Sequence, residues 1–544
     1  MANVKFQRKE FEKSIKLTPE VIEKISLFGT PLESLNEEEI EIEIFPNRPD
    51  LLSMQNYIRS FKSFLGIEKG VKSYKISKPE KNYKVKISPS LKNIRPFTTC
   101  AIIKDLSFND EKIKEIVDLQ EKLHNTIGRN RRKVAIGIYP LEKIKLPIKY
   151  TSLSPNEIKF IPLDSDSEMT GSQILQKHPK GREYAHLLEN MEKYPVFIDS
   201  NNKVLSMPPI INSETTGKVS STKKEVFVEC SGFDLNALNK TLNIVVATFA
   251  EMGGKIYQME IIHKGKTLTP NLSSEKMQIS LENTNKLLGL NLKESDLSKL
   301  LQKMEYNYSK GKVEVPAWRA DILHEVDIIE DIAIAYGYEN LVPEIPNIST
   351  IAHESHKSKV KSKISELLIG LGLIETSSYH LIKKEEKDLS KIESPIEVED
   401  SKTDYKYLRP NLLIPTLRIL AENKDAEYPQ KIYEIGAVFD RDNTQEAGIK
   451  ETESLIIAYS PSNFTEIKQT LEYLTKTLNI KHIIKESAHT SLIEGRTASI
   501  LVNNKTIGYL GELHPKALHA WNINMPVSII EISLEEIFKI LEEN

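Results

Sequence analysis

The apolar residues of this chain occur only in short runs, and this pattern limits what the chain can fold into. No run approaches the roughly 18 consecutive apolar residues that cross a bilayer, so we expect no membrane-spanning segment and no membrane partner. The 544 residues must be gathered around several separate cores, because a domain usually holds about 150 residues. We therefore predict a multidomain protein with helices and strands of ordinary length.

Charge and cysteine content limit the possible partners of the chain and the compartment in which it works. The 74 basic and 77 acidic side chains leave a formal net charge of -3, so any contact with nucleic acid would have to come from local basic patches. Cys100 and Cys230 lie far apart and outside any CxxC pattern, which argues against a zinc site or a disulfide framework. The N-terminal sequence MANVKFQRKEFEKSIK is too charged for a signal peptide. We therefore expect a cytoplasmic protein.

Segment patterns divide the chain into consecutive blocks. Residues 1–85 hold a helical segment, the alternating strand EIEIEIF and a second helix after PNRPDLLS. Residues 86–270 mix short β-rich runs with a helix that ends at a glycine pair. Residues 271–350 resemble a small winged-helix-like domain, and residues 351–544 predict a mostly antiparallel sheet covered by helices. The expected fold class is α+β and multidomain.

The segment WRADILHEVDIIEDIAIAYGY, residues 318–338, combines helical apolar spacing with many acids. We expect a helix from about His324 to Tyr336, stopped by Gly337. The predicted buried stripe of this helix consists of Val326, Ile329, Ile332, Ala333 and Tyr336.

The acids of this segment allow more than one interpretation. Asp327, Glu330 and Asp331 stand at i, i+3 and i+4, so their carboxylates share a second face of the helix. If Asp321 folds back toward that face, the four carboxylates converge, and a hard cation such as Mg²⁺ would relieve their repulsion. Two simpler interpretations stay open: the acids form a solvated face near the positive helix N-terminus, or Arg319 supplies the compensating charge.

Several motifs carry a family resemblance. PAWRADI followed by HEVDIIEDIAIAYGY is similar to a signature of the β subunit of phenylalanine-tRNA ligase, and EIEIFPNRPDLLS resembles an N-terminal element of that subunit. Further counterparts follow in family order: KLHNTIGRNRRKVAIGI, LSMPPIINSETTGKV, LRPNLLIPTLRILAENK, KIYEIGAVF and IEGRTASI. The resemblance covers nearly the whole chain, and the chain length is similar to that of the archaeal and eukaryotic cytosolic form.

The resemblance implies ATP-dependent attachment of phenylalanine to tRNA(Phe) by an (αβ)₂ heterotetramer. In the family the aminoacylation chemistry belongs to the α subunit, which binds ATP and phenylalanine. The resemblance also implies that Asp321, Asp327, Glu330 and Asp331 are magnesium positions, shared with the α subunit.

The last block resembles a class II synthetase domain that lacks the catalytic motifs. Such a site needs arginines for the phosphates and the forming adenylate. KIYEIGAVF keeps a strand and Glu434 but has no arginine, and VSIIEISL has neither a glycine run nor an arginine. We interpret the Gly-x-Gly of Gly370 and Gly372 as a helix terminus. We therefore expect no aminoacylation residues in this chain, and an interface role for this block.

A second activity is also implied by the resemblance, because family β subunits of this type hydrolyse tyrosine wrongly attached to the tRNA. LSMPPIINSETTGKV and VFVECSGFD resemble the segments that line this editing pocket. Asn212 and Ser213 would hold the ester or the terminal ribose, and Glu229 would recognise the tyrosine hydroxyl beside Ser231. Archaeal relatives often have Asp and Thr at the last two positions, which leaves the pocket dimensions open. Taken without the family, Pro208 and Pro209 are typical of a rigid turn and Ser231 of a strand-end hydrogen bond. Cys230 is typical of a core residue.

The densest basic cluster is GRNRRK, residues 128–133, which can meet tRNA phosphates, acids on a partner subunit, or only solvent. We expect Asn47 and Arg48 to fix their own loop. His124 and His324 lack metal-ligand spacing, so packing or solvent roles are sufficient for them.

The function predicted from the sequence is the scaffold and probable editing chain of a phenylalanine-tRNA ligase. The first rival is a self-contained ligase or a freestanding editing hydrolase. A second rival is a non-catalytic tRNA-binding or scaffold protein derived from synthetase domains.

Overall fold

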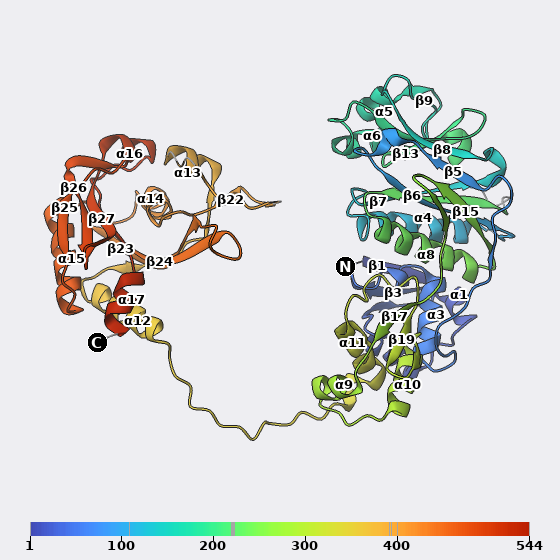
Figure 1. Ribbon diagram of the computed structural model, residues 1–544, viewed down its shortest axis with the longest axis horizontal. Helices are drawn as coiled ribbons and strands as arrows, with labels where there is room; N and C mark the ends of the chain where they lie inside the picture. Colours follow the sequence, from blue (N-terminus) through green and yellow to red (C-terminus); the bar gives the residue numbers. More distant parts are fainter. Residues whose placement is uncertain are drawn as a thin grey trace. The chain divides into compact units, whose positions relative to one another are not determined.

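The computed structural model describes residues 2–107, 109–218, 224–390, 392, 394–399 and 401–542. The chain divides into two compact units, Met1–Ile345 and Pro346–Asn544. Each unit combines helices with β-sheets (Figure 1), which confirms the predicted α+β multidomain class. The finer division into four domains, one of them winged-helix-like, stays a prediction.

The chain begins with a small sheet covered by helices. Strands β1 (Ala2–Gln7), β3 (Glu39–Ile44) and β2 (Leu32–Leu35) pair in the order β1-β3-β2, and the helices are α1 (Arg8–Glu12), α2 (Pro19–Leu27) and α3 (Met54–Phe64). The alternation in β3 buries one face of the strand, because successive side chains point to opposite sides. After β3, Arg48 donates two hydrogen bonds to the buried carboxylate of Asp50, at 2.9 and 3.0 Å, so Arg48 fixes its own loop as expected.

A large sheet forms the middle of the first unit, with the strand order β13-β12-β11-β8-β5-β15-β6-β14-β7 and with β16 and β4 paired to β15. These strands are β4 (Ile76–Ser77), β5 (Lys84–Ile87), β6 (Phe97–Lys104), β7 (Val134–Pro140), β8 (Ile148–Leu153), β11 (Tyr194–Ile198), β12 (Val204–Met207), β13 (Ile211–Asn212), β14 (Val226–Gly232), β15 (Lys255–Ile262) and β16 (Lys266–Thr269). Helices α4 (Asp110–Asn125) and α8 (Leu235–Glu251) pack on this sheet (Figure 1).

Strand β14 places alternate residues on the two faces of this sheet. Val226, Val228 and Cys230 join the core that includes α8, whereas Phe227 joins a second core with Tyr139. Cys230 is fully buried, so its interpretation as a core residue is confirmed. Glu229 shares the face of Phe227, because residues at i and i+2 of a strand point the same way.

Smaller elements lie beside the β13 end of the sheet. They are β9 (Lys159–Phe160), β10 (Met169–Thr170), α5 (Gly171–Lys177), α6 (Pro179–Tyr184) and α7 (Glu214–Gly217). Together with β11 and β12 they surround an apolar core of their own.

The rest of the first unit is a three-stranded sheet with three helices. The strands β17 (Glu275–Gln278), β19 (Lys312–Val315) and β18 (Asn307–Ser309) pair in the order β17-β19-β18, and the helices are α9 (Leu281–Leu288), α10 (Glu294–Lys303) and α11 (Glu325–Tyr336). The bounds of α11 and the stop at Gly337 are confirmed. Two positions of the predicted stripe are not buried. Val326 is 49% exposed, because it lies in the first turn, and Tyr336 is only partly buried. Ile328 and Ala335 are buried instead.

Buried polar contacts join the parts of the first unit. Arg59 on α3 pairs with Glu305 at 2.7 Å, and both side chains are almost fully buried. Also on α3, Asn56 donates to Thr248 of α8 at 2.8 Å. Because each of these groups would be left unsatisfied by separation, the contacts fasten the N-terminal part to both following parts.

The second unit is built on a seven-stranded sheet with the order β20-β23-β24-β28-β27-β26-β25. The strands are β20 (Ile374–Glu375), β23 (Gln430–Arg441), β24 (Ile449–Ser460), β25 (Ile483–Glu486), β26 (Leu492–Val502), β27 (Lys505–Leu513) and β28 (Ser528–Ser533). All neighbours are antiparallel except β20 and β23, so the predicted mostly antiparallel sheet is confirmed. Two separate apolar cores involve its strands.

Helices of the second unit include α12 (His356–Gly370), α14 (Leu413–Glu422), α15 (Phe464–Thr477), α16 (Pro515–Ala520) and α17 (Glu535–Glu542). A short hairpin of β21 (Leu381–Lys383) and β22 (Tyr405–Leu408) stands with α13 (Lys384–Leu389). Gly370 ends α12, and Gly372 has a φ of +79°, a left-handed conformation that glycine adopts without steric cost. This Gly-x-Gly is therefore a helix terminus, as predicted.

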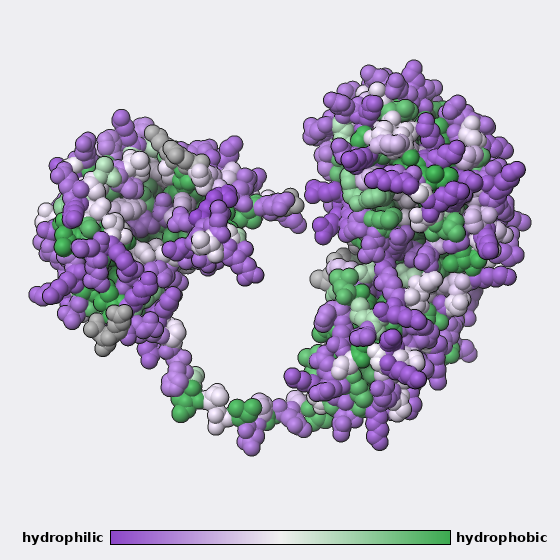
Figure 2. Space-filling view, in the orientation of Figure 1, coloured by the Kyte–Doolittle hydropathy of each residue, from purple (hydrophilic) through white to green (hydrophobic). Residues whose placement is uncertain are grey.

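Residues 341–355 connect the two units as irregular backbone. Apolar side chains along this segment face solvent (Figure 2). They are Val342, Ile345, Ile348 and Ile351. Within the described ranges, no helix has the length and apolar character needed to cross a membrane.

Candidate functional site

The two segments predicted to line an editing pocket border one cavity of about 500 Å³. Asn212, at the end of β13, and Glu229, in the middle of β14, both line this cavity. Ser213 and Ser231 are fully buried. Ser213 bonds to Thr215 at 3.0 Å and Ser231 accepts from Arg95 at 3.3 Å. The structure thus brings two of the four predicted residues to the cavity surface and places the other two in protein contacts.

Tyr139 on β7 organises the inner end of the cavity. Its hydroxyl lies 2.8 Å from Ser206 Oγ, 3.2 Å from Glu229 Oε1 and 3.3 Å from Asn212 Oδ1. Gly137 makes room for this cluster, since a Cβ there would stand 2.6 Å from Glu229 Oε1. Strands β7, β12, β13 and β14 therefore hold a compact set of polar groups at one end of the cavity.

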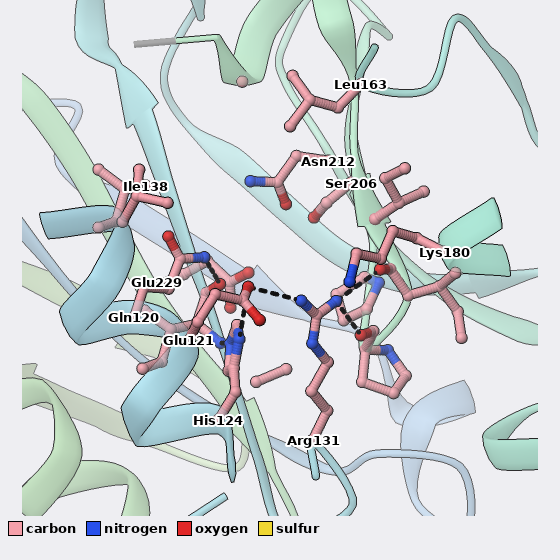
Figure 3. A pocket seen from close by; sticks show the side chains of 18 of the residues that line it. Gln120, Glu121, His124, Arg131, Ile138, Leu163, Lys180, Ser206, Asn212 and Glu229 are labelled. Atoms are coloured by element: carbon pink, nitrogen blue, oxygen red, sulfur yellow. Dashed lines mark hydrogen bonds and ion pairs between the residues drawn. The ribbon is translucent and has the colours of Figure 1, made fainter. Parts of the chain in front are cut away.

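Helix α4 supplies the opposite wall. Figure 3 shows Gln120, Glu121 and His124 on this helix, with Arg131 reaching in from the following loop. Arg131 pairs with Glu121 at 2.7 Å and donates to the carbonyl of Ile210 at 2.9 Å. The arginine thereby ties α4 to the segment that precedes Asn212.

The two carboxyl groups of the cavity have opposite electrostatic environments. Burial raises the pKa of Glu229 to about 8, although the charge of Arg95 and the neighbouring hydroxyl groups of Tyr139 and Ser231 oppose this rise. Burial also acts to raise the pKa of Glu121, but the neighbouring His124 and Arg131 lower it to about 2. Near neutral pH the cavity therefore holds one protonated carboxyl group and one carboxylate.

Several buried polar atoms around the cavity have no hydrogen-bond partner in the described part of the chain. They include Glu229 Oε2, Arg131 Nε and His178 Nδ1. Buried polar groups in folded proteins are almost always bonded to protein, water or ligand. The cavity is therefore suited to a polar ligand that completes these bonds.

Sequence reasoning missed part of this wall. The basic cluster of residues 128–133 was expected to face RNA, a partner or solvent, yet Arg131 is 7% exposed and lines the cavity. His124, expected only to pack, accepts a hydrogen bond from Ile136 at 2.8 Å and also lines the cavity. The available signal was the spacing of Gln120, Glu121 and His124, which places them on adjoining positions of one helix.

The acids before and within α11 do not converge. Arg319 pairs with Asp321 at 2.7 Å and with Asp331 at 2.8 Å, and its guanidinium is buried. Asp327 instead accepts from the backbone N–H groups of Leu323 and His324, both at 2.7 Å. Glu330 is exposed. The compensating charge is therefore Arg319, one of the simpler interpretations.

This arrangement does not fit a magnesium ion held by this chain alone. The described residues contain no group of three or more His, Cys, Asp or Glu side chains placed to bind a metal. Two of the four predicted ligands are occupied by Arg319, and a third caps the helix. The magnesium role shared with a partner stays a prediction.

In the second unit, an arginine from outside the predicted strand occupies the face of β23. Arg409 pairs with Glu434 at 2.7 Å, and both side chains are almost fully buried. Ser378 also donates to Glu434 at 2.7 Å. Gly436 allows this approach, because a Cβ there would stand 2.4 Å from Arg409 Nη2. The guanidinium of Arg409 is therefore bound by the buried carboxylate of Glu434.

The chain is similar to known proteins along most of its length. Residues 341–534 match the family described as phenylalanyl tRNA synthetase beta chain CLM domain, and residues 277–338 match the tRNA synthetase B5 domain. The phenylalanine–tRNA ligase beta subunit of Archaeoglobus fulgidus is 36% identical over 535 residues, which cover 95% of each chain. Its counterpart from Pyrococcus furiosus is 38% identical and covers 91% of this chain and 90% of its own length.

A solved structure is also similar to the first part of the chain. It is an N-terminal fragment of the phenylalanyl-tRNA synthetase beta subunit from Pyrococcus horikoshii, with a TM-score of 0.59 and 38% identity. The match covers 62% of this chain and 99% of the fragment.

The antiparallel sheet of the second unit and the matched domains place the chain among the subunits of class II aminoacyl-tRNA synthetases. More narrowly, the chain belongs to the family of phenylalanine–tRNA ligase beta subunits.

Proposed function

We propose that this chain works in an (αβ)₂ heterotetramer whose α subunit binds ATP and phenylalanine and carries the aminoacylation site. The chain itself supplies a scaffold and contacts to tRNA(Phe). Support comes from the second unit, where Arg409 is buried against Glu434 and Ser378. A guanidinium held in this way is not free to bind the phosphates of ATP.

Reconstitution tests this assignment against its rivals. Phenylalanine charging is expected only when the purified chain is mixed with its α subunit. Formation of phenylalanyl-adenylate by the isolated chain would instead favour a self-contained ligase. Normal charging by the α subunit without this chain would favour a scaffold protein with no role in aminoacylation.

We further propose that the cavity hydrolyses Tyr-tRNA(Phe). The observation that carries this proposal is the buried Glu229, whose Oε2 lacks a partner in the described chain beside a cavity of about 500 Å³. A tyrosine side chain placed there donates its phenolic O–H to Glu229. Phenylalanine has no hydroxyl and would leave the carboxyl group unsatisfied, which costs about 1–3 kcal/mol. This difference selects tyrosine for removal.

The remaining polar groups suit the ester end of the substrate. The Asn212 side chain amide lines the cavity and would hold the ester or the terminal ribose. Ser213 follows it and is fully buried, and its backbone N–H donates to the carbonyl of Leu205 at 2.8 Å, which fixes the backbone beside Asn212. Hydrolysis then requires a water placed near the ester, and Glu121 and Arg131 are the charged groups on the facing wall.

Substitution of Glu229 tests the editing proposal. In the complex with the α subunit, Glu229→Ala is expected to slow Tyr-tRNA(Phe) hydrolysis while phenylalanine charging stays normal, because charging occurs on the other subunit. Intact proofreading in this variant would remove Glu229 from the pocket. Hydrolysis by the chain without the α subunit would support a freestanding editing activity.

For magnesium, we propose a role only at the boundary with the α subunit. Glu330 is exposed and Asp327 is partly exposed, so both remain accessible to an ion completed by a partner's oxygen atoms. The double variant Asp327→Ala, Glu330→Ala is expected to weaken magnesium dependence or assembly with the α subunit. Unchanged assembly and charging across a magnesium titration would refute this role.

A further inference from the structure

Arg95 lies behind the cavity wall, in the segment between the 3-10 turn η2 (Pro89–Leu91) and β6. Its side chain is buried, with 3% of the residue exposed. Among the described residues, no carboxylate forms an ion pair with it, and its hydrogen bonds go to neutral oxygen atoms. A buried guanidinium without an ion-pair partner is costly, so its retention needs a reason.

The guanidinium of Arg95 joins two segments that shape the cavity. It donates to the carbonyl and the hydroxyl of Ser231 on β14, at 2.6 and 3.3 Å. It also donates to the carbonyls of Arg131 and Arg132, at 3.4 Å each. One side chain thus fastens the strand that carries Glu229 to the loop that carries Arg131.

That loop needs such support. Arg129, Asn130 and Arg131 all have positive φ values, between +48° and +65°. L-residues other than Asn and Asp pay about 1–2 kcal/mol each in this left-handed region, and Arg129 and Arg131 are both of this kind. Two such residues in one short loop persist only where outside bonds hold them. The Arg95 contacts to two carbonyls of the loop are bonds of this kind.

The charge of Arg95 acts on Glu229. The positive charge opposes the rise in the pKa of Glu229 that burial causes. The other titratable groups that interact electrostatically with Glu229 in the described chain are Tyr139, Tyr150 and Cys100, together with Cys230 on the opposite face of the strand. Burial raises the pKa of each of them, so they are neutral at physiological pH. Arg95 is therefore the formal charge that favours the ionised form of Glu229.

We propose that Arg95 is a positioning and specificity-determining residue of this pocket. Its guanidinium bonds to both segments and so aligns Glu229 with Arg131. Its charge strengthens Glu229 as a hydrogen-bond acceptor for the phenolic hydroxyl. This inference rests on the proposed editing function and assigns a role to a residue outside the cavity surface. Glu229 is protonated near neutral pH and ionises as the pH rises through about 8, and the ionised acceptor makes a stronger hydrogen bond to the phenol than the neutral one. Discrimination between tyrosine and phenylalanine should then depend on Arg95.

The test uses the complex with the α subunit and compares Arg95→Gln, which removes the charge, with Arg95→Lys, which keeps it. Lys92→Gln is the matched control, because Lys92 is exposed on the same segment. The measurements are kcat and KM for Tyr-tRNA(Phe) hydrolysis from pH 6 to pH 9, each divided by the value for Phe-tRNA(Phe). This ratio cancels the pH dependence of the ester itself. Thermal unfolding and phenylalanine charging are recorded for every variant.

For Arg95→Gln we expect a loss of about tenfold to hundredfold in the tyrosine-to-phenylalanine ratio. The midpoint of its pH profile should rise by about one pH unit. Arg95→Lys should keep the wild-type midpoint and regain part of the rate. Lys92→Gln should match the wild type, and phenylalanine charging should be unchanged throughout.

Contrary results separate this inference from the proposed function. If the wild-type complex fails to hydrolyse Tyr-tRNA(Phe), the editing proposal is wrong. If the wild type hydrolyses it and Arg95→Gln keeps the wild-type ratio and midpoint, the role of Arg95 is wrong while editing stands. If Arg95→Gln unfolds, Arg95→Lys decides, because a shifted midpoint in that variant would overturn the charge effect.

Discussion

Glu229 and Glu434 are both buried carboxyl groups on inner strands of β-sheets, but their surroundings differ. Glu434 accepts from the guanidinium of Arg409 and from the hydroxyl of Ser378, both at 2.7 Å. Glu229 bonds to Tyr139 through Oε1 and keeps Oε2 without a partner in the described chain, beside a cavity. A saturated carboxylate holds a fold together, whereas an unsatisfied one beside a cavity leaves a hydrogen bond for a ligand.

The largest expected effect tests the saturated side of this comparison. Arg409→Met should lower the free energy of unfolding of the second unit by about 3–5 kcal/mol, because Glu434 would remain buried without a counter-charge. Denaturant unfolding of the full chain measures this change. The control is Arg496→Met, whose ion pair with Glu512 involves a side chain that is 59% exposed, so the expected loss is about 0–1 kcal/mol. Equal losses in the two variants would break the comparison.

Glu229→Gln tests the carboxyl group that has an oxygen without a partner in the described chain. Gln has the shape of the protonated acid, so stability at pH 4 should match the wild type. Because burial raises the pKa of Glu229 to about 8, the wild type loses stability as the pH rises from about 4.5 to 8, and the variant should be the more stable at pH 7 and above. Tyr-tRNA(Phe) hydrolysis should fall by about 1.5–3 kcal/mol in transition-state stabilisation. A large loss of stability at pH 7 would mean that Glu229 serves the fold, as Glu434 does.

Glu115 on α4 is a third carboxyl group, intermediate between the fully bonded Glu434 and Glu229, which has one oxygen without a partner. It accepts from the backbone N–H of Met54 at 2.8 Å, and burial raises its pKa to about 7. Because the folded pKa is raised, the stabilising contribution is complete below about pH 4.5 and is lost as the pH rises through 7. Glu115→Gln should therefore be more stable than the wild type at pH 8 by about 1–3 kcal/mol and equal to it at pH 4. Thermal unfolding at the two pH values measures this, and a constant difference would contradict it.

Asp327 gives the smallest expected effect, because its bonds are made at a partly exposed helix end. Asp327→Ala should cost about 0.5–2 kcal/mol, the usual loss for a helix N-terminal cap. Glu330→Ala, at an exposed position of the same helix, should stay within about 0.5 kcal/mol of the wild type. Chemical unfolding in the presence and absence of magnesium would measure both changes. A loss for Asp327→Ala only when magnesium is present would favour a metal in this chain instead.

Local patterns predicted the parts of the fold that depend on near neighbours. The spacing of apolar residues and the glycine at 337 gave the bounds of α11, and alternation along β14 separated Cys230 from Glu229. The family resemblance selected Asn212 and Glu229, which now line one cavity. The exposure of Val326 was not predicted, because a first-turn residue of a helix can fit the apolar spacing and still lie beyond the core.

Residues whose roles depend on distant segments escaped prediction. Arg409 reaches Glu434 from outside the strand, and Arg319 takes up two acids that a metal was expected to bind. Arg131 was read as part of a surface cluster, yet it turns inward to Glu121 and Ile210. A single sequence records that arginine is present, but not which buried oxygen atoms the fold will bring to it.

The buried contacts of α3 have a consequence for the movement of the substrate. Arg59 pairs with Glu305 and Asn56 bonds to Thr248, so α3 holds the N-terminal part, the part that carries the cavity and the part that follows it as one block. Under the proposed function, this block cannot swing its hydrolytic cavity toward a mischarged amino acid. The flexible acceptor strand of the tRNA must therefore carry the wrongly attached amino acid to a cavity that stays in place.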